Sequence, residues 1–243
     1  MSGSEPLAIE SGPHRLVGRL HVPATPPRGA FLVTHPHPGH GGHMDHPVVV
    51  TTAERAVEAG CLALRFDFRG VRGSEGDVRD DEGHLEDVRR AAALLVERLP
   101  ARPLLGAGFS YGARLLAWSV GPGTPAPVPF RGLLLLAPAT KVPRSPRDFG
   151  NLLLGRPLDE AATDANAIAS LSRIPLPTRV IVGSNDVVAP EDELAAALSP
   201  RARLEVLEGL NHFFSRGRGA SATDLETLVP ALDDAIERLL ASS

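Results

Sequence analysis

Gly108-Phe109-Ser110-Tyr111-Gly112 is the stretch that decides the fold of this chain. It follows the apolar run Pro103–Ala107 and opens a segment, Ala113–Ser119, that can form a helix. Alone, a Gly-x-Ser-x-Gly pattern also fits a surface turn, but between a strand and a helix it is typical of a nucleophile elbow. Such a turn is so sharp that only small residues fit two positions before and after the serine. Ser110 is therefore the candidate nucleophile, and the N–H groups that open the helix point at it.

Strand-like and helical patterns alternate around this stretch along most of the chain. The strand-like runs are Arg15–Val22, Ala30–His35, Cys61–Phe66, Pro103–Ala107, Gly132–Ala137, Arg179–Gly183 and Leu204–Leu207. The helical runs are Pro47–Ala59, Glu82–Leu99, Tyr111–Val120, Glu160–Ser172, Glu191–Leu198 and Ala222–Leu240. The alternation predicts an α/β fold, a doubly wound and mostly parallel sheet with helices on both faces. We expect Arg15–Val22 to pair antiparallel at the edge, and Lys141–Leu158 to form a minimal cap.

Length and composition favour one globular unit. The 243 residues are 43% apolar and 22% charged, so we expect a single domain over residues 1–243 with a substantial core. The net charge of −4 is made of interspersed residues, which predicts neither a nucleic-acid partner nor a membrane surface. Met1–Pro6 lacks the features of a secretion signal, and no stretch approaches the roughly 18 apolar residues of a membrane span. We expect a cytoplasmic protein in which Cys61 is a core residue.

Two further residues complete a candidate catalytic triad with Ser110. Asp186 lies just beyond the strand-like run Arg179–Gly183, and His212 lies beyond the last one. Ligands gather at the carboxyl ends of parallel strands, so these three residues should meet at one edge of the sheet. Alone, Asp186 also fits a turn or cap aspartate and His212 a loop histidine. The order serine, acid, histidine favours a triad, in which the base activates the serine and the acid orients the base.

The remaining site residues should stabilise an oxyanion and contact the substrate. One N–H donor is that of Tyr111, directly after the serine, and the second should come from the loop after Ala30–His35. Two prolines in this loop carry no N–H, so His37 is the best second donor, with Gly39 behind it. Phe149 and Phe213 are candidates for substrate binding, although core packing explains them equally well.

The chain resembles the α/β-hydrolase superfamily, and within it the dienelactone-hydrolase-like group of small bacterial serine hydrolases with an H-P-H-P loop. The matching motifs are His35-Pro36-His37-Pro38, Gly41-Gly42-x-Met44-Asp45, Arg65-Phe66-Asp67-Phe68-Arg69-Gly70, Gly73-x-x-x-Gly76, the Ser110 pentapeptide, Gly183-x-x-Asp186 and His212-Phe213-Phe214. They occur in the family's order from about residue 30 to 214. The resemblance implies carboxylesterase-type chemistry on a small-molecule ester, without a metal or organic cofactor.

The departure from this pattern is a run of extra histidines, His40, His43 and His46. Such a cluster could bind a metal, but no H-E-x-x-H arrangement is present and we expect no metal. The prediction is a serine hydrolase that cleaves a small or short-chain carboxylic ester through an acyl-enzyme. Three alternatives stay open: a peptidase or amidase with the same triad, a catalytically silent binding protein on a hydrolase scaffold, and metal-dependent hydrolysis.

Overall fold

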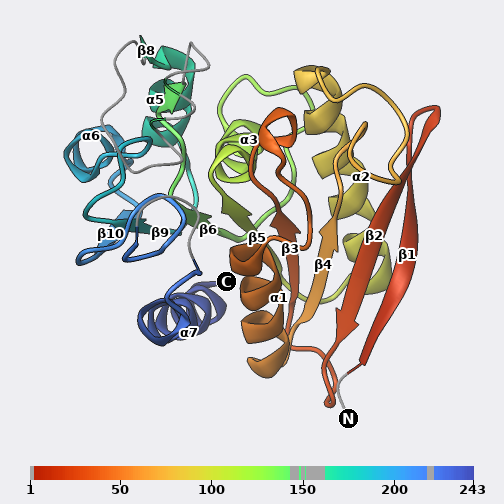
Figure 1. Cartoon of the computed structure of the whole chain (residues 1–243). Coiled ribbons are helices and arrows are strands. Elements are labelled where there is room, and N and C mark those ends of the chain that lie inside the picture. Colours follow the sequence, from red (N-terminus) through yellow and green to blue (C-terminus); the bar gives the residue numbers. More distant parts are fainter. Residues whose placement is uncertain (1–2, 143–147, 149–150, 152–161, 218–221) are drawn as a thin grey trace.

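An eight-stranded sheet forms the centre of the molecule (Figure 1). The computed structural model describes residues 3–142, 148, 151, 162–217 and 222–243. In spatial order the strands are β1 (Gly3–Ser11), β2 (His14–Val22), β4 (Leu62–Phe66), β3 (Ala30–Thr34), β5 (Leu104–Phe109), β6 (Gly132–Leu136), β9 (Thr178–Gly183) and β10 (Ala202–Leu207). β2 is antiparallel to both of its neighbours, whereas the six strands from β4 to β10 are parallel to one another. The predicted doubly wound, mostly parallel α/β sheet is confirmed.

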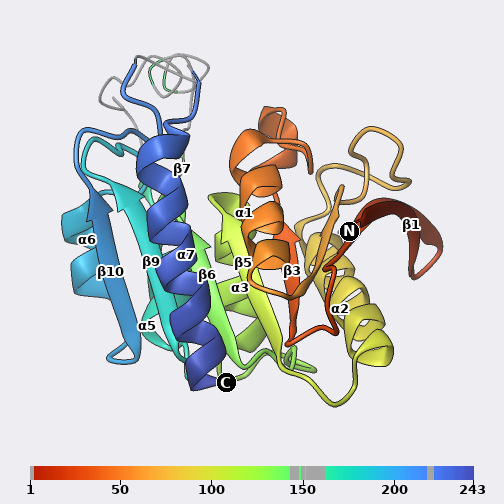
Figure 2. The same ribbon diagram turned by 90° about the horizontal axis from the view of Figure 1, so that it is seen from below.

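Helices cover both faces of this sheet (Figure 2). On one face, α1 (Pro47–Glu58) and α7 (Leu225–Ser242) lie side by side. On the other face, the layer comprises α2 (Asp81–Arg98), α3 (Tyr111–Val120), α5 (Ala165–Ser172) and α6 (Glu191–Ala197). Because both faces are covered, the central strands β3, β4, β5 and β6 are buried at every position, which explains their continuous apolar sequences.

The N-terminal edge of the sheet differs from the expectation. β2 was expected at the edge, but β1 pairs with it along its whole length, from Gly3 opposite Val22 to Ser11 opposite His14. Only Ile9 and Ser11 of β1 are buried, and its first four residues are exposed. The strand therefore carries too little apolar alternation to be recognised in the sequence.

A small two-stranded ribbon also replaces the start of an expected helix. The helix expected over Glu160–Ser172 begins only at Ala165, because Ala162–Thr163 forms strand β8 and pairs antiparallel with β7 (Lys141–Val142). Asp164 ends the ribbon and starts α5 as its N-cap, accepting hydrogen bonds from the N–H groups of Asn166 and Ala167. Most of the expected cap segment Lys141–Leu158 lies outside the described residues.

A buried ionic network attaches β1 and the loop after β4 to α2. Asp87 of α2 is fully buried and accepts hydrogen bonds from the Ser11 hydroxyl at 2.6 Å and the Arg69 backbone N–H at 2.9 Å. Its carboxylate also binds the Arg69 guanidinium at 2.8 Å, which in turn contacts Asp80 at 2.7 Å. The charged partners of Arg69 therefore lie on and just before α2, and its guanidinium also donates to the Ser11 hydroxyl of β1 at 3.3 Å. Asp67 acts separately by accepting the Met44 N–H at 2.7 Å.

Removing the Asp87 carboxylate should destabilise the fold strongly. Asp87→Ala leaves the guanidinium of Arg69 buried with only the partly exposed Asp80 beside it, and breaking such a pair costs about 3–5 kcal/mol. Urea unfolding should show a large loss in unfolding free energy. Asp234→Ala, which removes an exposed pair with Arg238 on α7, is the control and should unfold close to the wild type. Equal unfolding midpoints for the two variants would contradict the role given to Asp87.

Candidate active site

The Ser110 turn is formed by a close approach of the backbone between β5 and α3. Ser110 has a φ of 56° and a ψ of −112°, a left-handed conformation that is strained for a serine. A Cβ at Gly108 would lie 2.6 Å from the Ala113 nitrogen, and one at Gly112 would lie 2.6 Å from the His35 carbonyl oxygen. Both positions therefore require glycine, as the sharpness of a nucleophile elbow demands.

The structure brings together the three residues predicted to form a triad. His212 Nε2 lies 2.9 Å from Ser110 Oγ, and His212 Nδ1 lies 2.8 Å from Asp186 Oδ2. Exposed fractions are only 7% for Ser110, 5% for Asp186 and 5% for His212. Because β5, β9 and β10 are parallel, the three loops that carry these residues lie at the same edge of the sheet.

Backbone hydrogen bonds orient the Asp186 carboxylate. Oδ1 accepts the N–H groups of Val188 at 2.8 Å and Ala189 at 2.9 Å, which leaves Oδ2 for His212. A carboxylate accepts, so His212 donates its Nδ1–H. In the neutral ring Nε2 then carries a lone pair, and it can accept the Ser110 hydroxyl proton. The arrangement can withdraw a proton from Ser110.

The turn that carries Asp186 and the loop that carries His212 are joined directly. A Cβ at Gly183 would lie 2.1 Å from the Leu210 carbonyl oxygen, so the two segments touch. Ser184 Oγ accepts the Gly209 N–H at 2.8 Å, and Asn211 Oδ1 accepts the Phe213 N–H at 2.9 Å. Ser184 and Asn211 were not predicted as site residues, and their only signal in the sequence is their position beside the two triad candidates.

The two expected oxyanion donors, His37 and Tyr111, lie next to each other. Their ring centroids are 4.7 Å apart, and among the described residues neither backbone N–H donates to a protein acceptor. The N–H of Gly39, the second choice in this loop, donates to His37 Nδ1 at 3.0 Å and is therefore occupied. Both His37 and Pro36 line the cavity at Ser110.

Buried His35 holds the start of this loop in place. Its Nε2 accepts the Phe68 N–H at 3.1 Å, so Nδ1 carries the proton and donates to the Pro36 carbonyl oxygen at 2.7 Å. Burial lowers the pKa of His35 to about 3, which keeps the ring neutral and preserves this donor–acceptor arrangement. His35 thus has a local structural role that its place in the histidine-rich run did not indicate.

Two of the extra histidines, His40 and His46, form part of an uncharged wall. His40 and His46 line the cavity at Ser110, and burial lowers the pKa of both, that of His46 to about 4. His43 lies on the loop and accepts the Asp45 N–H at 3.2 Å. Within the described part of the chain, no group of three or more histidine, cysteine or acidic side chains is arranged to hold a metal.

The cavity beside Ser110 is small and lined by aromatic rings. Its volume is about 90 Å³. Phe213, expected to contact substrate, lines it together with Phe109 and His46, and its ring lies 5.6 Å from that of His212. Phe149, the other such candidate, lies outside the described residues.

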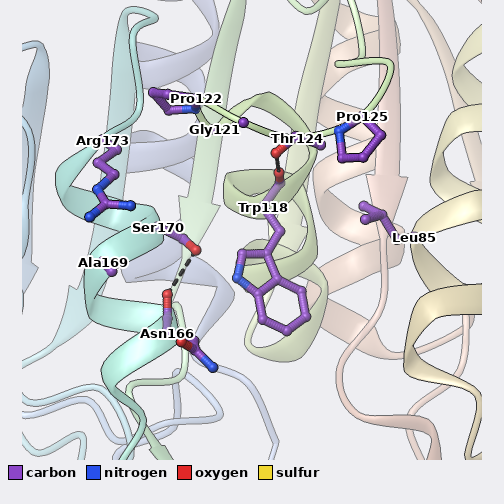
Figure 3. A pocket seen from close by; sticks show the side chains of 11 residues that line it. Leu85, Trp118, Gly121, Pro122, Thr124, Pro125, Asn166, Ala169, Ser170 and Arg173 are labelled. Carbon is purple, nitrogen blue, oxygen red and sulfur yellow. Dashed lines mark hydrogen bonds between the residues drawn. The ribbon is translucent and has the colours of Figure 1, made fainter.

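A second and larger pocket lies away from the three triad candidates. It has a volume of about 340 Å³ between the end of α3 and α5, and Figure 3 shows Trp118 at its centre with Leu85 and Arg173 on the walls. The Arg114 guanidinium packs over the Trp118 ring at 5.2 Å from its centroid, which gives this ring a packing contact within α3. In the described segments, no helix is both long enough and apolar enough to cross a membrane.

Comparisons with known proteins agree on the fold. A family model described as an alpha/beta hydrolase domain matches residues 27–239. A serine hydrolase homologue from Coxiella burnetii has a TM-score of 0.71 at 24% identity, covering 98% of this chain and 96% of its own. Est1E from Butyrivibrio proteoclasticus, solved with ferulic acid, has a TM-score of 0.73 at 17% identity, covering 97% and 99%.

Two curated relatives are similar over shorter stretches. An uncharacterized protein of Rickettsia prowazekii is 36% identical over 110 residues, which are 44% of this chain and 46% of the relative. A monoacylglycerol lipase of Mycolicibacterium smegmatis is 31% identical over 111 residues, 41% of this chain and 38% of the relative. The matched stretches span less than half the length of either relative.

The neutral state of His46 should make folding stability depend on pH. Its pKa is about 4 when folded against 6.5 for an unperturbed histidine, so between these values only the unfolded chain takes up the proton. The unfolding free energy therefore does not depend on His46 protonation above pH 6.5, and it decreases as the pH falls from 6.5 toward 4. His46→Asn, which retains an N-cap for α1, should flatten the dependence of unfolding free energy on pH in this window. Above pH 7.5 the difference in unfolding free energy between variant and wild type should be constant. If the unfolding free energies of the two proteins have equal slopes against pH below 6.5, His46 is not held neutral.

Proposed function

This chain belongs to the α/β-hydrolase family, and on that basis we propose that it is a serine carboxylesterase that cleaves a small or short-chain carboxylic ester. The observation that carries the proposal is the hydrogen-bonded row from Ser110 through His212 to Asp186, with separations of 2.9 and 2.8 Å. A serine hydroxyl is a weak nucleophile, and this row supplies the base and the orienting carboxylate that it needs.

The acylation step would use each group in a separate role. Ser110 Oγ attacks the ester carbonyl carbon while His212 Nε2 takes the hydroxyl proton, and the carbonyl oxygen becomes an oxyanion. The N–H groups of His37 and Tyr111 stabilise this oxyanion. When the tetrahedral intermediate collapses, the bond to the alcohol oxygen breaks and His212 gives its proton to the leaving alcohol.

Water would complete the cycle by the same route. It gives a proton to His212 as it attacks the acyl carbon, and the second tetrahedral intermediate expels Ser110 Oγ, which recovers that proton. Asp186 keeps its hydrogen bond to the imidazole throughout and stabilises the imidazolium formed in both steps. The products are a carboxylic acid and an alcohol, and residues of the chain together with water supply every proton transfer in the cycle.

A peptidase or amidase with the same triad is the second candidate, and one of the two curated relatives weighs against it. The monoacylglycerol lipase of Mycolicibacterium smegmatis, similar over 111 residues, is named for ester hydrolysis. An alcohol leaves more readily than an amine, so an ester places the smaller demand on proton delivery by His212. A silent binding protein would have no need for the polarised Ser110 hydroxyl, and a serine-directed probe distinguishes that case.

Ser110→Ala should abolish both ester hydrolysis and covalent labelling by a fluorophosphonate probe. Removing a triad member lowers the rate by several orders of magnitude, and the probe reacts with a hydroxyl that a base activates, as His212 would activate that of Ser110. Mass spectrometry of the labelled wild type should place the adduct on the peptide that contains Ser110. Ser172→Ala, which changes an exposed serine on α5, is the matched control and should hydrolyse and label normally. Retained activity in Ser110→Ala would exclude Ser110 as the nucleophile.

Short acyl chains should be the better substrates. The cavity of about 90 Å³ at Ser110 holds few carbon atoms, so the methylenes of a long chain stay in water and forgo the roughly 0.8 kcal/mol that each gains on burial. We expect a higher kcat/KM for p-nitrophenyl acetate or butyrate than for longer esters, measured below the micelle concentration. A steady rise in kcat/KM up to the palmitate would contradict a small acyl site while leaving the triad assignment intact.

A further inference from the structure

The side chain of Tyr111 is anchored to the start of α2. Although Tyr111 directly follows Ser110, its ring is directed to the neighbouring helix, where its hydroxyl lies 2.7 Å from Asp81 Oδ1 and 2.9 Å from His84 Nδ1. The ring is 2% exposed, and the His84 side chain is completely buried. Neither Asp81 nor His84 was identified from the sequence, because they lie about 30 residues from the elbow.

Proton counting gives this chain of hydrogen bonds a direction. A phenol has one proton, and the carboxylate of Asp81 can only accept it, so the Tyr111 oxygen accepts the Nδ1–H of His84. Burial lowers the pKa of His84, so the ring is neutral. The order is therefore His84 to Tyr111 to Asp81, with each group donating to the next.

The anchored ring also supports the loop after β3. The His37 ring lies 4.7 Å from the Tyr111 ring, and the Phe68 ring packs against its edge at 6.2 Å. The Arg114 guanidinium lies 5.5 Å from the ring centroid. The two residues expected to supply the oxyanion N–H groups are thus in side-chain contact, and only one of them is fastened to a helix by hydrogen bonds.

We propose that Asp81 and His84 are positioning residues that set the direction of the Tyr111 backbone N–H through the Tyr111 hydroxyl. The inference rests on the proposed function, in which this N–H stabilises the oxyanion. The peptide between Ser110 and Tyr111 follows a strained serine, so local backbone preference does not hold it in place. The first hydrogen bond of α3, from the Arg114 N–H to the Ser110 carbonyl oxygen at 3.2 Å, holds one side of this peptide, and the anchored Tyr111 side chain constrains the other. Catalysis is sensitive to such placement because an error of about 1 Å can cost roughly a hundredfold in rate.

The exposure of Asp81 favours this role over a purely structural one. Its side chain is 56% exposed, so its hydrogen bond adds little to folding stability. Glu82, the next residue of α2, is also exposed, and the Tyr111 hydroxyl bonds to Asp81 and His84 instead. The pair Asp81 and Glu82 therefore separates the loss of a surface carboxylate from the loss of the contact to Tyr111.

The test compares Tyr111→Phe, Asp81→Ala, their double variant and the control Glu82→Gln on a short-chain ester. Tyr111→Phe and Asp81→Ala, which removes the oxygen that accepts the Tyr111 proton, should each lower kcat by about tenfold, less than the loss of a whole oxyanion donor, with KM unchanged. Binding of a trifluoromethyl ketone, which forms a tetrahedral oxyanion on the serine, should weaken by the same factor. The double variant should match Tyr111→Phe alone, because both changes break one chain. Glu82→Gln should match the wild type in every measurement.

Two results would overturn the inference while the proposed function stands. One is wild-type kcat in Asp81→Ala and Tyr111→Phe when Ser110→Ala is inactive. The other is a double variant whose loss is the product of the single losses, which would mean that the residues act separately. Asp81→Ala changes an exposed side chain, so it keeps the test decisive if Tyr111→Phe folds poorly. Hydrolysis by Ser110→Ala would instead overturn the proposed function, and this inference with it.

Discussion

The contact between the Ser110 turn and the end of β3 is the constraint on which the site depends. Gly112 approaches the His35 carbonyl and Gly108 approaches the Thr34 hydroxyl so closely that a Cβ at either would lie under 3.0 Å away. This contact holds Ser110 at a positive φ and keeps the loop that carries His37 beside it. Strain of this kind persists only where the surroundings over-determine it, here the buried strands β3, β5 and β6.

The electrostatics of the site follow from burial. The pKa of both His37 and His46 is lowered to about 4 because their rings are desolvated, so the imidazoles around Ser110 are neutral. In the proposed reaction His212 must become an imidazolium, and a second cation nearby would oppose that proton transfer. Neutral histidines provide flat walls and hydrogen-bonding groups without that opposition. Three histidines of the run that suggests metal binding in the sequence, His37, His40 and His46, therefore form an uncharged lining in the structure.

The parts of the site that sequence could predict are those that follow directly from chain order. Ser110, Asp186 and His212 each come after a strand-like run, and parallel strands place such residues at one edge. The strand β1 could not be predicted, because its hydrogen bonds to β2 hold it rather than an apolar pattern. The same holds for Asp87, whose burial depends on Arg69 folding against α2.

By itself, the sequence determined the alternation of elements, the parallel sheet and the identity of the three residues that meet at its edge. It did so because hydrophobic periodicity and the glycines of the elbow are local properties of the chain. Only the tertiary structure decided which hydrogen bonds orient those residues: the N–H groups that hold Asp186, the occupied N–H of Gly39, and the link from Tyr111 to Asp81. Contacts between side chains and backbone groups far apart in the chain have no periodic signal, since they exist only after the helices have packed on the sheet.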